Sequence, residues 1–111
     1  MNKYKTVDKL TKKGYEYIVD KNGDKSWYLN GNRHREDGPA IEYKNGSKSW
    51  YLSGNKHREE GPAIEWADGD KSWYLSGRNY GKKEPDNWIE LVSKNKQVKK
   101  EYKLKPLSKM V

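Results

Sequence analysis

A unit of 23 residues is repeated through the central part of the chain, and this repetition constrains the fold more than any other feature. A half-unit at 15–21 precedes three full units, which are residues 22–44 (NGDKSWYLNGNRHREDGPAIEYK), 45–67 (NGSKSWYLSGNKHREEGPAIEWA) and 68–90 (DGDKSWYLSGRNYGKKEPDNWIE). With 111 residues, the chain has room for one domain. We therefore expect a single array of short repeated elements.

Two turn signals occur in each unit, separated by short stretches of alternating polar and apolar residues. The first is Asn22-Gly23, Asn45-Gly46 or Asp68-Gly69, which predicts a two-residue type I′ hairpin loop because both central residues can adopt a positive φ. The second is Asn30-Gly31, Ser53-Gly54 or Ser76-Gly77, which marks another hairpin. The segments Asp37-Gly38-Pro39 and Glu60-Gly61-Pro62 end one strand and begin the next. The pattern predicts a single-layer antiparallel meander of about eight or nine short strands.

A two-residue loop at Asn45-Gly46 would set the strand register. Ile41 would then face Trp50 across the hairpin, and the same pairing would recur one unit earlier and one unit later. Alternation adds a leucine two residues after each tryptophan, so this face is predicted to be the buried side. Its members are Ile18, Trp27, Leu29, Ile41, Trp50, Leu52, Ile64, Trp73 and Leu75.

The opposite face is predicted to carry tyrosines and charges. A second hairpin loop at 30–31 would pair Trp27 with His34, and a loop at 31–32 would pair Leu29 with His34. Both alternatives place the two histidines on the tryptophan side and the neighbouring basic residues on the tyrosine side. The tyrosine side would then hold Tyr28, Tyr51, Tyr74, Arg33, Arg35, Lys56, Arg58, Glu42 and Glu65.

The core of such a sheet must be built from aromatic rings. Ile, Leu and Val contribute only 16 residues, Phe is absent and 36% of the residues are charged, a composition that alone would indicate disorder. The 5 Trp and 9 Tyr residues offset this, because each ring can bury about 150–250 Å². We therefore expect an all-β fold with an aromatic core.

The end of the chain has a different character. Pro85 and Asp86 are typical of a helix start, and Trp88, Leu91 and Val92 have helical spacing. We therefore divide the chain into a β-repeat domain, 1–84, and a segment with a short helix and lysine-rich tail, 85–111. Residues 22–80 hold 9 basic and 9 acidic side chains, so the net charge of +8 resides in the two ends.

The repeat resembles the MORN family, and in particular the variant MORN repeats of small bacterial and tailed-phage proteins, some of which are labelled as antitoxin components. The resemblance covers residues 15–81. It is carried by Gly31, His34, Arg35, Gly38-Pro39-Ala40, Asn45-Gly46 and Trp50-Tyr51-Leu52, together with their counterparts 23 residues further on. It implies a sheet of β-hairpin repeats that serves as an interaction surface.

No enzymatic chemistry is indicated by the sequence. It contains no cysteine, no phosphate-binding glycine loop and no HExxH motif. His34 and His57 correspond to Tyr80 in the third unit, which favours packing positions over metal ligands. The acidic residues Glu36, Asp37, Glu59 and Glu60 fall in turns, where they are expected to serve solubility. We predict no catalytic residue, no metal site and no cofactor.

The expected function is binding to another macromolecule. Tyrosine and arginine are enriched at binding hot spots, which gives as candidate protein-binding residues Tyr28, Arg33, Arg35, Tyr51, Lys56, Arg58 and Tyr74. With the resemblance, this suggests a phage-type accessory inhibitor that neutralises a toxin or host defence effector by occupying its surface. The lysine-rich end is either a solvated tail or an electrostatic arm that steers association.

Two further classes of function remain open. An RNA- or DNA-binding protein could hold phosphates through its basic termini, with contacts from Lys94, Lys96, Lys99, Lys100, Lys103 and Lys105, and inhibition could depend on bound RNA. Alternatively, unpaired sheet edges could join copies into a homo-oligomer. No apolar run reaches the roughly 20 residues of a membrane span, and the lysine-rich first twenty residues contain no apolar core. We expect no membrane partner, no secretory signal and a cytoplasmic location.

Overall fold

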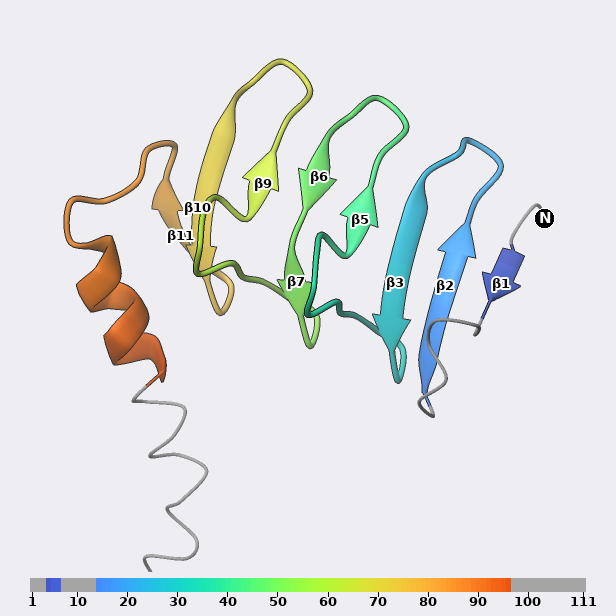
Figure 1. Cartoon of the computed structure of the whole chain (residues 1–111), viewed down its shortest axis with the longest axis horizontal. Coiled ribbons are helices and arrows are strands. Elements are labelled where there is room, and N and C mark those ends of the chain that lie inside the picture. Colours follow the sequence, from blue (N-terminus) through green and yellow to red (C-terminus); the bar gives the residue numbers. More distant parts are fainter. Residues whose placement is uncertain (1–3, 7–13, 97–111) are drawn as a thin grey trace, which may run out of the picture.

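A computed structural model of the protein describes residues 4–6 and 14–96, and the described part is mainly an antiparallel sheet of hairpin strands (Figure 1). Of the described residues, 88–96 form a short C-terminal helix. The predicted all-β meander with a short C-terminal helix is therefore confirmed. The strands are β1 (Tyr4–Thr6), β2 (Tyr15–Val19), β3 (Lys25–Leu29), β4 (Asn32–Arg33), β5 (Ile41–Glu42), β6 (Lys48–Ser49), β7 (Tyr51–Leu52), β8 (Asn55–Lys56), β9 (Ile64–Glu65), β10 (Lys71–Leu75) and β11 (Arg78–Gly81).

Each unit is built around one long strand, or around two short strands that follow each other directly in its place. In the first unit this is β3, which pairs with β2 along its whole length. On its other side β3 pairs with β5 near its start and with β4 near its end. β6 and β7 follow the same path in the second unit, and β10 in the third. In the strand order of the sheet, β5 therefore lies between β3 and β6, and β9 lies between β6 and β10 (Figure 1).

In the first two units, the central tryptophan of the long strand determines where the paired chain leaves that strand. The Trp27 N–H donates to the Ala40 carbonyl at 2.8 Å, while the Trp27 carbonyl accepts the His34 N–H at 3.0 Å. One residue thus faces two partners, and the five residues between them, 35–39, are not paired with β3. The Arg35 N–H donates instead to the Tyr51 carbonyl of β7 at 3.2 Å, and the residues after it project from the strand ladder. Trp50 bonds in the same way to Ala63 and His57, so that 58–62 project. We call 35–39 and 58–62 the first and second projecting segments.

The two kinds of hairpin differ from each other. Asn30-Gly31 has φ values of 51° and 87°, and Leu29 pairs with Asn32, so this loop is a two-residue type I′ turn at 30–31. Ser53-Gly54 and Ser76-Gly77 have the same geometry. The first of the two predicted alternatives, which pairs Trp27 with His34, is therefore confirmed.

The Asn-Gly and Asp-Gly loops are not two-residue turns, and this prediction was wrong. The Gly46 N–H donates to the Tyr43 carbonyl, and the Tyr43 N–H donates to the Ser47 carbonyl, both at 2.9 Å. The loop therefore holds three residues, with Gly46 in the left-handed region at φ 99°. Asn45 does not adopt a positive φ, and its side-chain oxygen instead accepts the Ser47 N–H at 2.8 Å.

The extra loop residue shifts the register by one and moves the isoleucines to the other face. Ile41 pairs with Ser49 rather than with Trp50, and the pairs Ile18–Ser26 and Ile64–Ser72 repeat this. The tryptophan face therefore keeps Trp27, Trp50, Trp73, Leu29, Leu52 and Leu75. The tyrosine face holds Tyr28, Tyr51 and Tyr74 together with Ile18, Ile41 and Ile64, of which Ile41 and Ile64 are buried.

The C-terminal helix covers the tryptophan face of the third unit. Trp88 is buried against Trp73 and Leu75, with Leu91 and Val92 packed beside them. These helical residues are the ones predicted from their spacing. Within the described residues, no helix has the length and apolar character needed to cross a membrane.

The tryptophans are expected to contribute unequally to stability. Trp73→Ala removes a ring that is only 7% exposed, so we expect the free energy of unfolding to fall by about 3–5 kcal/mol. Trp50→Ala should cost less, because the Trp50 ring is only half-buried. Denaturant unfolding followed by circular dichroism measures both. Equal losses would contradict this assignment of the core.

Candidate functional site

The arginine that begins each projecting segment lies over a tryptophan ring and holds the segment against the tryptophan face. The Arg35 guanidinium lies 3.8 Å from the centre of the Trp27 ring and donates to the Pro39 carbonyl and the Glu42 carboxylate, both at 3.1 Å. It also donates to Asp37 at 3.1 Å. A Cβ on Gly38 would lie 3.0 Å from this guanidinium, which explains the glycine at this position.

The second projecting segment repeats this arrangement. The Arg58 guanidinium lies 3.8 Å from the centre of the Trp50 ring. It donates to the Pro62 carbonyl at 3.2 Å and to the Glu65 carboxylate at 3.0 Å. These contacts give both arginines a structural function in holding their segments.

Four charged residues were therefore predicted to lie on the wrong face of the sheet. Arg35, Arg58, Glu42 and Glu65 were expected on the tyrosine face and lie on the tryptophan face. The glutamates lie there because the register is shifted by one residue, which turns each strand residue to the opposite face. The arginines lie in segments outside the strand ladder, where alternation does not apply. A contribution of Arg35 or Arg58 to partner binding stays a prediction.

The two histidines connect neighbouring units. Nδ1 of His34 accepts the N–H of Ser53, and Nδ1 of His57 accepts the N–H of Ser76, both at 2.8 Å. In each case Nε2 lies 3.2 Å from a carboxylate oxygen, of Glu36 and Glu59 respectively. Since an amide N–H can only donate, the accepting Nδ1 carries no proton. The sequence placed these residues on the tryptophan face but did not reveal this link.

The contribution of His57 to stability can be tested by removing this hydrogen bond. His57→Ala leaves the Ser76 N–H without its acceptor, and we expect the free energy of unfolding to fall by about 1–3 kcal/mol. His57→Asn is the matched control, because an amide oxygen can take the position of Nδ1 and should recover part of the loss. Thermal unfolding compares the variants. An Asn variant no more stable than the Ala variant would argue that ring packing dominates.

A stripe of alternating rings and cations runs across the tyrosine face. The Arg33 guanidinium lies 5.8 Å from the ring centres of both Tyr28 and Tyr51. The Lys56 ammonium lies 5.2 Å from the ring centre of Tyr74. Five of the seven residues predicted to bind a protein partner are thus brought together in one stripe. We call these five residues the tyrosine stripe.

Two further aromatic residues lie on the same face and were not singled out from the sequence. Tyr43 and Trp66 occupy equivalent repeat positions and are 38% and 42% exposed. Together with Tyr51, Lys56 and Ile64 they line a hollow of about 320 Å³. The alternation Ile41-x-Tyr43 and Ile64-x-Trp66 was the signal that could have placed them on this face.

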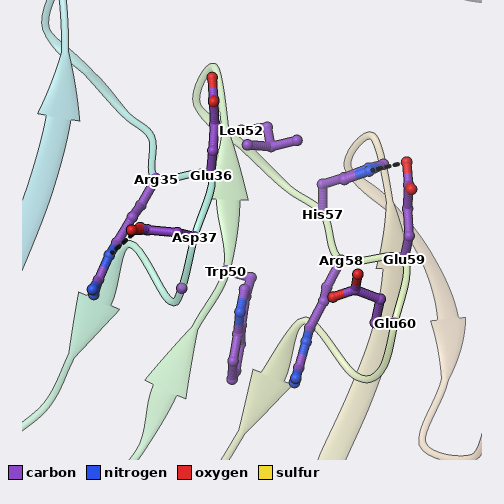
Figure 2. A pocket seen from close by; sticks show the side chains of 10 residues that line it. Arg35, Glu36, Asp37, Trp50, Leu52, His57, Arg58, Glu59 and Glu60 are labelled. Atoms are coloured by element: carbon purple, nitrogen blue, oxygen red, sulfur yellow. Dashed lines mark hydrogen bonds and ion pairs between the residues drawn. The ribbon is translucent and has the colours of Figure 1, made fainter. Parts of the chain in front are cut away.

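A larger groove lies on the tryptophan face between the two projecting segments (Figure 2). Its volume is about 610 Å³, and Trp50 and Leu52 lie between its walls. The first projecting segment forms one wall, which includes Glu36 and Asp37. The second projecting segment forms the other wall, which includes Glu59 and Glu60. The sequence assigned these four carboxylates to loop solubility alone. We call this the open groove.

The candidate lysines at the chain end are only partly described. Lys94 lies 3.5 Å from Glu90, and Lys96 lies 3.3 Å from Glu59. Lys99, Lys100, Lys103 and Lys105 lie outside the described residues. In the parts of the chain that the structure describes, no group of three or more His, Asp or Glu residues is arranged to hold a metal ion.

No family model, curated protein or solved structure matches the chain. The hairpin meander is compatible with an all-β fold of the repeat type. What the molecule binds must therefore be argued from its own surfaces.

Proposed function

We propose that this protein has no enzymatic activity and binds another protein through the tyrosine stripe. The observation that carries the proposal is the alternation of rings and cations, with Arg33 between Tyr28 and Tyr51 and with Lys56 at Tyr74. Such residues combine a large contact area with polar groups, which is the composition of binding hot spots.

Preorganisation of the stripe supports the same proposal. Each cation lies against a ring that is fixed on a strand, so less side-chain entropy is lost when a partner binds. The exposed rings of Tyr43 and Trp66 extend the aromatic surface. Glu42 and Glu65 lie on the opposite face, while Glu16 pairs with Tyr28 at the first ring of the stripe. The cations beside the later rings, Arg33 and Lys56, are therefore suited to an acidic partner surface.

The resemblance to variant MORN repeats supports a narrower form of this proposal. In that form the partner is a toxin or host defence effector in the cytoplasm, and the protein inhibits it by occupying the surface that the effector needs. The lysine-rich end would raise the association rate by long-range attraction. The mechanism is steric and requires no chemical step.

The stripe can be tested by purifying the tagged protein from cells after nuclease treatment and a high-salt wash. We expect a stoichiometric protein to remain bound, and Tyr51→Ala combined with Lys56→Ala to lower its recovery by about tenfold or more. Lys48→Ala with Lys71→Ala is the control, because both lysines are exposed and pair on the tryptophan face beside Glu65. Equal recovery with both double variants would overturn the proposal.

A second candidate function, binding of single-stranded RNA or DNA, is favoured by one observation. The carboxylates of Glu42 and Glu65, expected beside the tyrosines, lie on the other face. The stripe thus presents rings on which bases could stack and cations that could reach phosphates.

An oligonucleotide titration distinguishes this candidate. If nucleic acid is the ligand, the logarithm of the binding constant for a labelled oligouridine should fall linearly with the logarithm of salt concentration. Tyr51→Ala should then weaken binding by roughly ten- to a hundredfold. Fluorescence anisotropy measures both. Binding that is absent at low salt would exclude this candidate and leave the protein-binding proposal standing.

A further inference from the structure

The chain itself shows what fills a groove on the tryptophan face. Between the second projecting segment and the third unit, Trp88 of the C-terminal helix packs on Trp73 and Leu75. Its ring lies edge-on to Tyr80, with 5.8 Å between the ring centres. Its indole N–H donates to the Glu59 carbonyl at 2.8 Å. At the other end of the described helix, Lys96 pairs with the Glu59 carboxylate at 3.3 Å.

The open groove is the equivalent place one unit earlier. A shift of 23 residues relates Trp50, Leu52 and His57 to Trp73, Leu75 and Tyr80. The same shift relates Glu36 to Glu59, so the carbonyl and carboxylate that hold the helix have counterparts in the first projecting segment. In the described structure these counterparts border a hollow of about 610 Å³ (Figure 2).

The two grooves differ in charge. Where the open groove has Arg58, Glu59 and Glu60, the filled groove has Gly81, Lys82 and Lys83. The open groove therefore has carboxylates on both walls, although the chain as a whole carries a net charge of +8. Its two arginines pair with Glu42 and Glu65. Of the wall carboxylates, Asp37 also pairs with Arg35 at 3.1 Å and Glu59 with Lys96 at 3.3 Å, so Glu36 and Glu60 are the two that no Lys or Arg of the described residues pairs. An occupant that complements these walls is basic.

We propose that the open groove docks a basic amphipathic helix of a partner protein. The helix would place an aromatic side chain beside Leu52 and His57, as Trp88 is placed beside Leu75 and Tyr80. Apolar residues would follow three and four positions later, as Leu91 and Val92 do. A lysine or arginine eight positions after the aromatic residue would pair with Glu36. This site is separate from the tyrosine stripe and does not depend on it.

The test uses the full chain, labelled with ¹⁵N, and a synthetic peptide of residues 85–96 with blocked ends and the substitution Glu90→Lys as the probe, because the native segment is neutral and Glu90 is exposed. We expect amide shifts along both walls of the open groove and at Leu52. Tyr28 and Tyr74 should not shift. Trp73 should not shift either, because the tethered helix has an effective concentration in the millimolar range and keeps its own groove. Binding should be about tenfold or more weaker for a peptide with Trp88→Ala.

Charge is tested from both sides. A probe peptide that also carries Lys96→Glu should bind more weakly, and so should the probe peptide itself to a chain with Glu36→Lys. The Glu36 side chain is 72% exposed, and the third unit has lysine at this position, so this variant should fold. Glu84→Lys is the matched control, because it makes the same charge change at an exposed residue outside the open groove.

Three results would overturn the proposal. The first is the absence of shifts in the open groove at about 1 mM peptide, a concentration that would half-saturate a site with a millimolar Kd. The second is a set of shifts confined to the tyrosine face or to Trp73 and Trp88. The third is a concentration-dependent dimer without peptide in which Leu52 shifts, since the occupant would then be the helix of a second copy.

Discussion

The backbone hydrogen bonds of the central tryptophans in the first two units are the constraint on which the rest of the structure depends. Trp27 bonds to both His34 and Ala40, and Trp50 to both His57 and Ala63, so each of these two units must release five residues from its long strand. The released segment starts with an arginine and ends with a proline, which has no N–H to leave unpaired. The arginine then returns to cover the same tryptophan ring. Both walls of the open groove arise from this one backbone arrangement.

Polar links between units compensate for the small apolar core. The residues buried in the described structure include few large aliphatic side chains, and of the large rings only Trp73 and Trp88 are buried. Neighbouring units are joined by backbone bonds such as Gly54 N–H to the Arg33 carbonyl at 2.8 Å, and by the histidine links. Buried hydrogen bonds of this kind cost more to break than they gain on forming, which favours one register over its alternatives. A chain with 36% charged residues can thus form an ordered sheet.

The sequence predicted the array, the alignment of tryptophans with leucines on one face, and the helix, because these follow from periodicity alone. The prediction that this face is the buried side holds only for Trp73 and Leu75, since the first two units leave their tryptophans and leucines half-buried. The sequence did not predict the register at Asn45-Gly46, since the same dipeptide fits a two-residue loop and a three-residue loop. The third residue of the loop shifts the register by one and so moves Ile41 to the other face. The position of Arg35 could not be found by alternation, because it lies outside the ladder. The open groove was equally hidden, since its walls come from two units and its carboxylates are typical of any solvated turn.

The histidine links also give the array a direction. Each runs from an imidazole to a backbone N–H that lies 19 residues later in the chain, and none of the described links runs the opposite way. In the first unit, the equivalent N–H of Asn30 donates instead to the Gly14 carbonyl, which precedes it. During synthesis, His34 therefore gains its partner only when the next turn has left the ribosome, and His57 one turn after that. A chain shortened before Ser53 therefore leaves Nδ1 of His34 without this donor, and a chain shortened before Ser76 does the same to His57.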